Sequence, residues 1–73
     1  MIKKYFKLDR KNIVFVQFII EGYGDMATVK TVDPQAAIIQ VSIIPDFISD
    51  MHDLIEHLKD KYKMTETCLR ENG

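Results

Sequence analysis

The residues whose types could do chemistry gather in one segment near the C-terminal end of the chain. His52, Asp53, Glu56 and His57 are the one cluster of potential metal ligands or acid–base groups. On a helix, two histidines five positions apart point about 140° away from each other, so they cannot bind one ion. We therefore expect two surface pairs at i, i+4 spacing, His52 with Glu56 and Asp53 with His57, and no metal site, catalytic site or cofactor.

A second group lies near the N-terminus, where Arg10, Lys11 and Asn12 would form the first turn of a helix. Unpaired backbone N–H groups and two cations could hold a carboxylate or phosphate there, so these three are the candidate residues for a small anionic ligand. An ordinary solvated helix start is the favoured interpretation, because no glycine is present to wrap a phosphate. Residues 1–11 hold five basic residues against one acid, whereas the chain has net charge −1. This asymmetry favours an acidic ligand or head-to-tail contact between chains.

Other functional classes are disfavoured by composition. The single Cys68 excludes an internal disulfide and a multi-cysteine metal site. RNA-recognition sheets need aromatic residues on both central strands, and residues 36–44 contain none, so no nucleic-acid partner is expected. The longest apolar run, residues 13–20, is far shorter than the ~20 residues that cross a membrane, and charges interrupt any signal-peptide core. We therefore expect a cytoplasmic protein without a membrane partner.

The elements that must position these groups are read from hydrophobic periodicity. Alternating side chains predict strands over residues 2–8, 26–32 and 36–44. Asp33-Pro34-Gln35 is typical of the turn of a hairpin. Pro45 is expected to open a helix that runs to about Tyr62 and carries its apolar residues in one stripe. Residues 64–69 have the composition of a short closing strand.

Residues 9–23 carry two conflicting signals. Their β-branched and aromatic content is typical of a strand, whereas an N-cap residue at the start and two glycines at the end indicate a helix. The polar side chains decide, because Arg10, Gln17 and Glu21 would share one narrow stripe of a helix. We predict a helix; an extended segment would instead give a four-stranded meander with one helix.

The resulting order predicts an α+β fold, a ferredoxin-like or ACT-like β-α-β-β-α(-β) sandwich with an antiparallel sheet and two helices on one face. Without a linker or repeat, residues 1–69 are expected to form a single domain and residues 70–73 a polar C-terminal tail.

Three runs of residues carry a family resemblance: Asp9-Arg10-Lys11-Asn12-Ile13, Phe18-Ile19-Ile20-Glu21-Gly22-Tyr23-Gly24 and Ala27-Thr28-Val29-Lys30-Thr31-Val32-Asp33. They resemble a family of short bacterial proteins of unknown function that is similar to ACT domains, the small regulatory modules that bind amino acids at dimer interfaces. The likeness spans roughly residues 4–62. It implies an ACT-like fold, a regulatory role and a ligand that is a small anion or amino acid. The loop at residues 8–12 lacks the glycine that ACT domains typically place there.

The helix predicted over residues 9–23 is more apolar than one sheet requires. A helix packed on a sheet needs an apolar face of little more than ~100°, yet apolar side chains surround all but the polar stripe. Either the second helix and the tail cover this surface, or a partner does. We expect a homo-oligomer, most simply a dimer, that assembles through this helix, the first strand or both. The alternatives are a small anion-binding enzyme or sensor and an accessory subunit of a larger enzyme. The expected interface residues are Tyr5, Phe15, Val16, Phe18, Ile19 and Tyr23.

Overall fold

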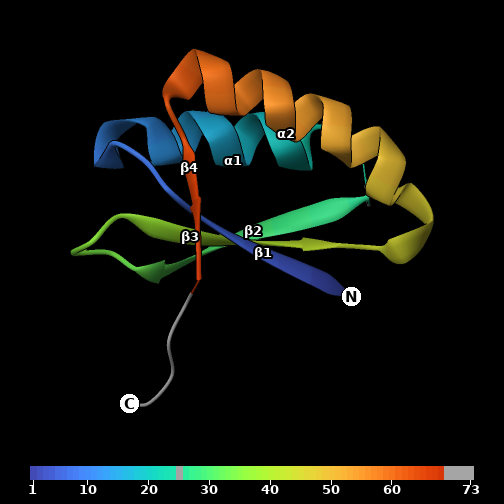
Figure 1. The fold of residues 1–73 in the computed structure, drawn as a ribbon, viewed down its shortest axis with the longest axis horizontal. Coiled ribbons are helices and arrows are strands. Elements are labelled where there is room, and N and C mark those ends of the chain that lie inside the picture. The colour runs from blue at the N-terminus through green and yellow to red at the C-terminus, as the bar shows by residue number, and fades with distance from the viewer. Residues whose placement is uncertain (25, 69–73) are drawn as a thin grey trace.

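The protein folds as two layers, a four-stranded antiparallel sheet with two helices lying together on one of its faces (Figure 1). The computed structural model describes residues 1–24 and 26–68; Leu69 and the expected tail lie outside the described residues. The elements are β1 (Ile2–Lys7), α1 (Ile13–Glu21), β2 (Ala27–Asp33), β3 (Ile38–Ile43), α2 (Ile48–Tyr62) and β4 (Thr65–Thr67), with 3-10 turns at Arg10–Asn12 and Pro45–Phe47 ahead of the helices. The α+β class is confirmed, and the arrangement is compatible with a ferredoxin-like fold.

The core lies between the layers because each strand turns alternate residues toward the helices. Ile39, Val41 and Ile43 of β3 are fully buried, and Phe6 of β1 lies beside them. Helix α2 adds its inner stripe, and α1 adds two side chains. These helical core residues are Met51, Ile55 and Leu58 of α2, and Val16 and Ile20 of α1.

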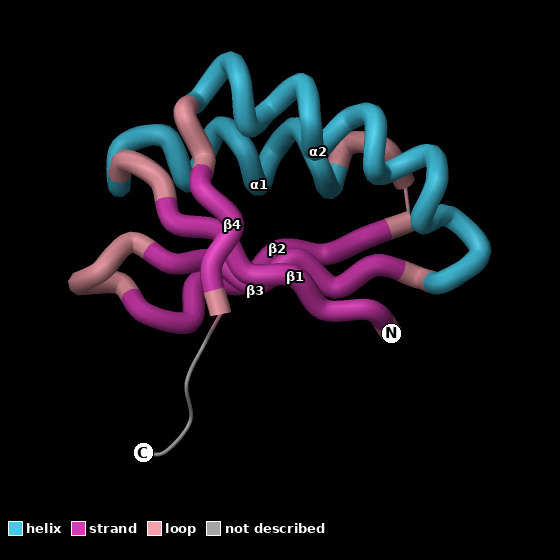
Figure 2. The backbone as a smooth tube through the Cα atoms, in the orientation of Figure 1, coloured by secondary structure: helices cyan, strands magenta, loops and turns pink. Residues whose placement is uncertain are grey.

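The strand order is β2-β3-β1-β4, which makes β1 an internal strand (Figure 2). β1 pairs with β3 along Ile2–Lys7, but with the short β4 only along Tyr5–Lys7. β1 therefore has a neighbouring strand on both sides along Tyr5–Lys7. Lys3 and Lys7 lie on the sheet face opposite the helices, whereas Lys4 lies on the helix side.

The prediction of a helix over residues 9–23 is confirmed, with α1 following directly on a 3-10 turn. α1 ends at Glu21, before the two glycines. Gly24 has φ +87°, a left-handed conformation that side chains disfavour, so a glycine is required at that position. The predicted hairpin turn also forms, because the Asp33 carboxylate accepts hydrogen bonds from the backbone N–H groups of Gln35 (3.1 Å) and Ala36 (3.0 Å).

Candidate functional site

The surface of α1 that faces away from the sheet is apolar. Phe18 lies four positions after Val14 and three positions after Phe15, so the three side chains share one side of the helix. Val14 is 63% exposed, Phe15 55% and Phe18 79%. Tyr23, just beyond the helix end, is 53% exposed. We call Val14, Phe15 and Phe18 the α1 outer face. Neither α2 nor the rest of the described chain covers it.

The residues expected at an interface divide among different parts of the molecule. Phe15, Phe18 and Tyr23 are exposed on or beside the α1 outer face. Val16 is fully buried, so it belongs to the core of the subunit and its place among the interface residues is corrected. Ile19 is partly buried and packs against the core. Tyr5 lies on the opposite sheet face, where its hydroxyl donates to Gln40 Oε1 at 3.1 Å.

The polar stripe of α1 lies along the edge of the sheet. The Glu21 carboxylate accepts a hydrogen bond from the backbone N–H of Val29 at 3.1 Å. Since β2 is an edge strand, alternate N–H groups point away from β3, and this one would otherwise have no partner in the sheet. The alignment of the polar residues was predicted correctly, but they face β2 and leave an apolar surface toward solvent.

A shallow groove of about 410 Å³ separates α1 from the β2–β3 hairpin. Of the three expected ligand residues, only Arg10 lines it; no acidic residue does. Lys11 instead lies 4.0 Å from the Asp9 carboxylate, and Asn12 makes no side-chain capping hydrogen bond. We call this space the hairpin groove. Its lining residues are Arg10, Ile13, Val14, Gln17, Thr31, Pro34 and Gln35.

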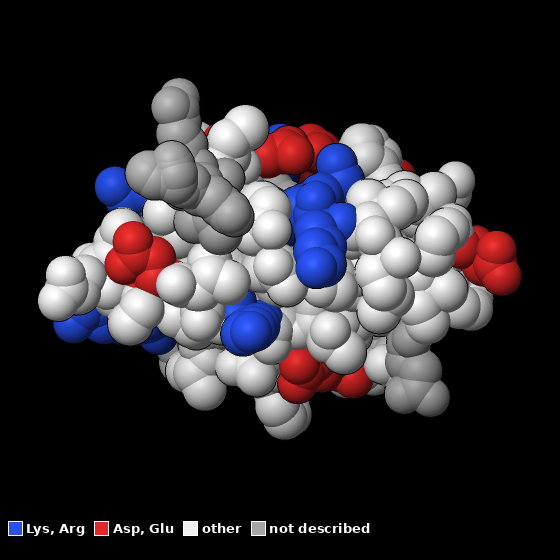
Figure 3. Space-filling view, turned by 90° about the horizontal axis from the view of Figure 1, so that it is seen from below, with Lys and Arg blue, Asp and Glu red and all other residues white. Residues whose placement is uncertain are grey.

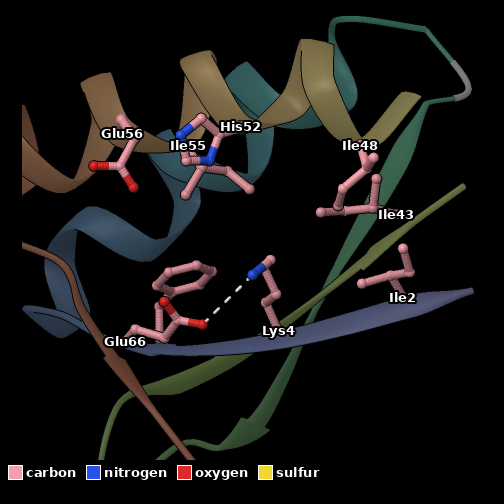
Figure 4. A pocket seen from close by; sticks show the side chains of 9 residues that line it. Ile2, Lys4, Ile43, Ile48, His52, Ile55, Glu56 and Glu66 are labelled. Carbon is pink, nitrogen blue, oxygen red and sulfur yellow. Dashed lines mark ion pairs between the residues drawn. The ribbon is translucent and has the colours of Figure 1, made fainter. Parts of the chain in front are cut away.

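A second groove, of about 290 Å³, opens between α2 and β1 (Figure 4). His52 and Glu56 reach over it from the helix, while Lys4 and Glu66 lie below on the strands with their charged atoms 3.6 Å apart. We call this space the interlayer groove; sequence reasoning missed it. The available signal was Lys4, a charged residue at an inward position of an alternating strand. Its apolar lining is Ile2, Phe6, Ile43, Ile48 and Ile55.

The histidine cluster of α2 does not form the expected pairs. Glu56 lies 3.3 Å from Lys59 Nζ, and no ion pair between described residues includes His52 or His57. Across residues 1–24 and 26–68, no three His, Cys, Asp or Glu side chains stand close enough together to hold a metal ion.

The sheet face opposite the helices is basic at its centre. Figure 3 shows lysine or arginine side chains in the middle of this view and acidic ones toward its margins. By alternation from the buried Phe6, β1 turns Lys3, Tyr5 and Lys7 to this face. The Gln40 amide links Tyr5 to the Ser42 hydroxyl, which accepts at 3.2 Å. These side-chain hydrogen bonds join β1 to β3 on this face of the sheet.

No helix of the described residues has the length and apolar character to cross a membrane. No match to the chain is found among curated proteins or among solved structures. A family model covers residues 6–61, a range that runs from the end of β1 through α1, β2 and β3 to the last turn of α2. The chain belongs to the family described as Domain of unknown function (DUF4911).

Proposed function

We propose that this protein is a self-associating, ACT-like regulatory module, and that two copies pair through their α1 outer faces. The observation that carries the proposal is the exposure of Phe18, 79%, beside that of Phe15 and Val14. Contiguous apolar surface of this kind usually marks an interface. The resemblance of residues 9–33 to ACT-like proteins supports the regulatory part.

The distribution of charge along α1 favours a second copy as the occupant. In an antiparallel pair whose two-fold axis crosses α1 at the level of residue 16, Val14 of one copy meets Phe18 of the other, because these two positions are equally far from residue 16. The same arrangement sets Lys11, whose side chain is 79% exposed, near Glu21 of the other copy. The two helix dipoles also oppose each other. A self-complementary surface is what a two-fold interface requires.

The exposed aromatic area on and beside the α1 outer face is large enough for a weak dimer. Phe15, Phe18 and Tyr23 together expose roughly 400 Å², given about 200 Å² for each aromatic side chain. A stable interface buries about 800 Å² on each partner. The aromatic residues would therefore supply about half of that area, and the polar rim of α1 the rest. We expect an equilibrium between monomer and dimer at micromolar concentration.

The test measures molar mass by light scattering over a range of protein concentrations. Phe18→Glu places a charge in the centre of the patch and should give a monomer at every concentration. Ser49→Glu, which adds the same charge on an exposed position of α2, should dimerise like the unmodified chain. A monomer for the unmodified chain at high micromolar concentration, or equal mass for both variants, would sink the proposal.

A second candidate function, binding of a small anion, is favoured by the hairpin groove. Arg10 lines this groove and no acidic residue does; among described residues, Arg10 forms no ion pair. A guanidinium matches a carboxylate in a planar, bidentate geometry. An amino acid would leave its ammonium group without a carboxylate partner in this groove, so we favour a simple carboxylate or phosphate.

This second candidate is tested by thermal denaturation with inorganic phosphate, acetate and glycine. Arg10→Gln should abolish any rise in Tm caused by acetate or phosphate, while Lys11→Gln, which lies outside the groove, should retain it. A Tm that none of these compounds changes would exclude the site, and so would a rise in Tm that is still seen in the Arg10→Gln variant.

A further inference from the structure

β2 forms one edge of the sheet, and α1 covers that edge at Val29, whose backbone N–H donates to the Glu21 carboxylate at 3.1 Å. In an antiparallel ladder, the N–H and C=O groups of every second residue point the same way. Those of Thr31 therefore point away from β3, as those of Val29 do. Among the described residues, no hydrogen bond outside the sheet ladder includes either group. Thr31 thus offers a backbone donor and a backbone acceptor to another chain.

The hairpin groove runs beside this part of the edge, with Thr31 lining it from the strand and Gln17 from the helix. α1 and β2 run in opposite directions, so the start of α1 and the hairpin turn lie at the same end of the molecule (Figure 1). Arg10, which precedes α1, lines the groove at that end. A chain that enters the groove along β2 therefore passes Thr31 and then reaches Arg10.

The edge is open and regular for only a short distance on either side of Thr31. Glu21 already occupies the N–H of Val29, and the ladder between β2 and β3 is irregular between Thr31 and Asp33. A long strand that crossed the site would lose pairing at both ends, whereas a short terminal segment would not. The size of the open edge therefore favours the end of a chain.

The charge in the groove indicates which end of a chain it fits. Arg10 is exposed, no acidic residue lines the groove, and among the described residues Arg10 forms no ion pair. A guanidinium binds a carboxylate through two parallel hydrogen bonds. A free C-terminus has the complementary charge, whereas a free N-terminus is a cation and would be repelled.

We propose that the hairpin groove binds the free C-terminal end of a partner protein as a short strand parallel to β2, with its carboxylate on Arg10. The proposal rests on the second candidate function, anion binding at Arg10, and names the ligand of that site. Strand addition to a sheet edge and capture of a terminal carboxylate are both known modes of peptide recognition. Here one groove supplies the groups for both.

The hydrogen bonds of a parallel pair fix the register of this ligand. A residue of one strand bonds to the residues just before and just after its neighbour on the other strand. With the third residue from the C-terminus beside Thr31, the Thr31 N–H donates to the carbonyl of the fourth residue from the end. The Thr31 carbonyl accepts the N–H of the second residue from the end. The last residue then extends toward Arg10.

Distances along the two elements agree with this register. Glu21 is level with Val29, and Arg10 lies about 18 Å before Glu21, at about 1.5 Å per residue in the helix and about 2 Å in the 3-10 turn. Thr31 lies about 7 Å beyond Val29, which leaves about 11 Å between the levels of Thr31 and Arg10. The last two residues of the ligand span about 7 Å of this distance, and the carboxylate and the arginine side chain span the rest.

Side-chain alternation sets the chemistry of the ligand. Thr31 shares the helix side of β2 with the buried Val29. The last residue of the ligand and the third residue from its end lie on that side as well, next to Ile13 and Val14, which line the groove. These two ligand residues are therefore apolar, and the residue between them faces away from the helices and is polar.

The test uses the full chain and the tripeptide N-acetyl-valyl-threonyl-valine with a free carboxylate. Its acetyl carbonyl takes the place of the carbonyl of the fourth residue. At saturating peptide, NMR should show shifted signals for the methyl groups of Ile13 and Val14, and slower exchange of the Thr31 amide with water. The Val29 amide, already bonded to Glu21, should exchange at an unchanged rate.

Two altered peptides separate the contacts. The C-terminal amide of the same tripeptide lacks the charge that Arg10 binds. It should bind about tenfold more weakly, the size of a hydrogen bond to a charged group. Methylation of the threonine nitrogen removes the donor to the Thr31 carbonyl and should weaken binding by about fivefold.

Two matched protein variants test the carboxylate contact. Arg10→Gln should weaken binding of the free acid by about tenfold. This variant should also bind the acid and the amide equally, because the charge that distinguishes them no longer has a partner. Lys11→Gln removes the same charge from the neighbouring residue, outside the groove, and should leave the affinity nearly unchanged.

Each part of the proposal has a result that would overturn it. Acetate bound at Arg10, with no slowing at Thr31 when the peptide is added, would refute the added strand and leave the anion site standing. Equal binding of acid and amide by the unmodified chain would refute the carboxylate contact. Slow exchange at Thr31 without peptide would show that the chain covers its own edge, or that a second copy does if the effect grows with protein concentration. The α1 dimer is tested on Phe18, which neither variant changes.

Discussion

The Glu21 carboxylate accepts the backbone N–H of Val29 at 3.1 Å, so a helix side chain closes the free edge of β2 at that residue. This contact explains why the polar stripe of α1 faces the sheet edge. The apolar α1 outer face then lies toward solvent.

Loss of this contact should destabilise the fold. Glu21→Ala leaves the Val29 N–H without a partner, and we expect the free energy of unfolding in urea to fall by about 1–2 kcal/mol. Glu56→Ala removes an exposed carboxylate on α2 whose partner is Lys59 at 3.3 Å, and should cost under about 0.5 kcal/mol. Equal losses for the two variants would mean that the β2 edge does not need Glu21.

The end of α2 contains a strained residue. Lys63 has φ 57°, a left-handed conformation in which a side chain is unfavourable. Glycine relieves this strain, so Lys63→Gly should raise the free energy of unfolding by about 1 kcal/mol. Lys61→Gly, inside the last turn of the helix, should lower it by up to about 1 kcal/mol. Urea denaturation of both variants checks the sign, and a loss at position 63 would contradict the geometry.

The buried side chains of α2 should contribute more to the free energy of unfolding than its partly buried ones. Leu58 is 1% exposed, and Leu58→Ala should cost about 2–5 kcal/mol because the cavity lies in the core. Leu54 is only partly buried at the margin of the core, so Leu54→Ala should cost clearly less. Thermal or urea denaturation compares the two, and a reversed order would mean that the helix is rotated about its axis.

Several parts of the fold could be predicted from local pattern. The Asp33 turn, the helix that Pro45 opens and the stripe of Arg10, Gln17 and Glu21 depend on residues close in sequence. The periodic signal in each is strong. Each element therefore appears within a few residues of its expected bounds.

The rest depends on contacts between distant segments. The internal position of β1 follows from its pairing with β3 on one side and β4 on the other, and both strands are distant in the sequence. Tyr5 and its β3 partner Gln40, for example, are 35 residues apart. The direction of the polar stripe depends on the position of β2 in the folded chain. The spacing of Arg10, Gln17 and Glu21 predicts that they share one side of the helix, but not whether that side faces solvent or the edge of the sheet. Likewise the burial of Val16, opposite Phe18 on the same helix, depends on which side the sheet approaches.

The central claim, pairing of two copies through α1, is tested most directly by isotope-filtered NMR on a mixture of labelled and unlabelled chains. We expect intermolecular NOEs from the Phe18 ring to the Val14 methyl groups, and their loss in Phe18→Glu. A dimer without these NOEs, or a monomer at the concentrations of the experiment, would contradict the claim.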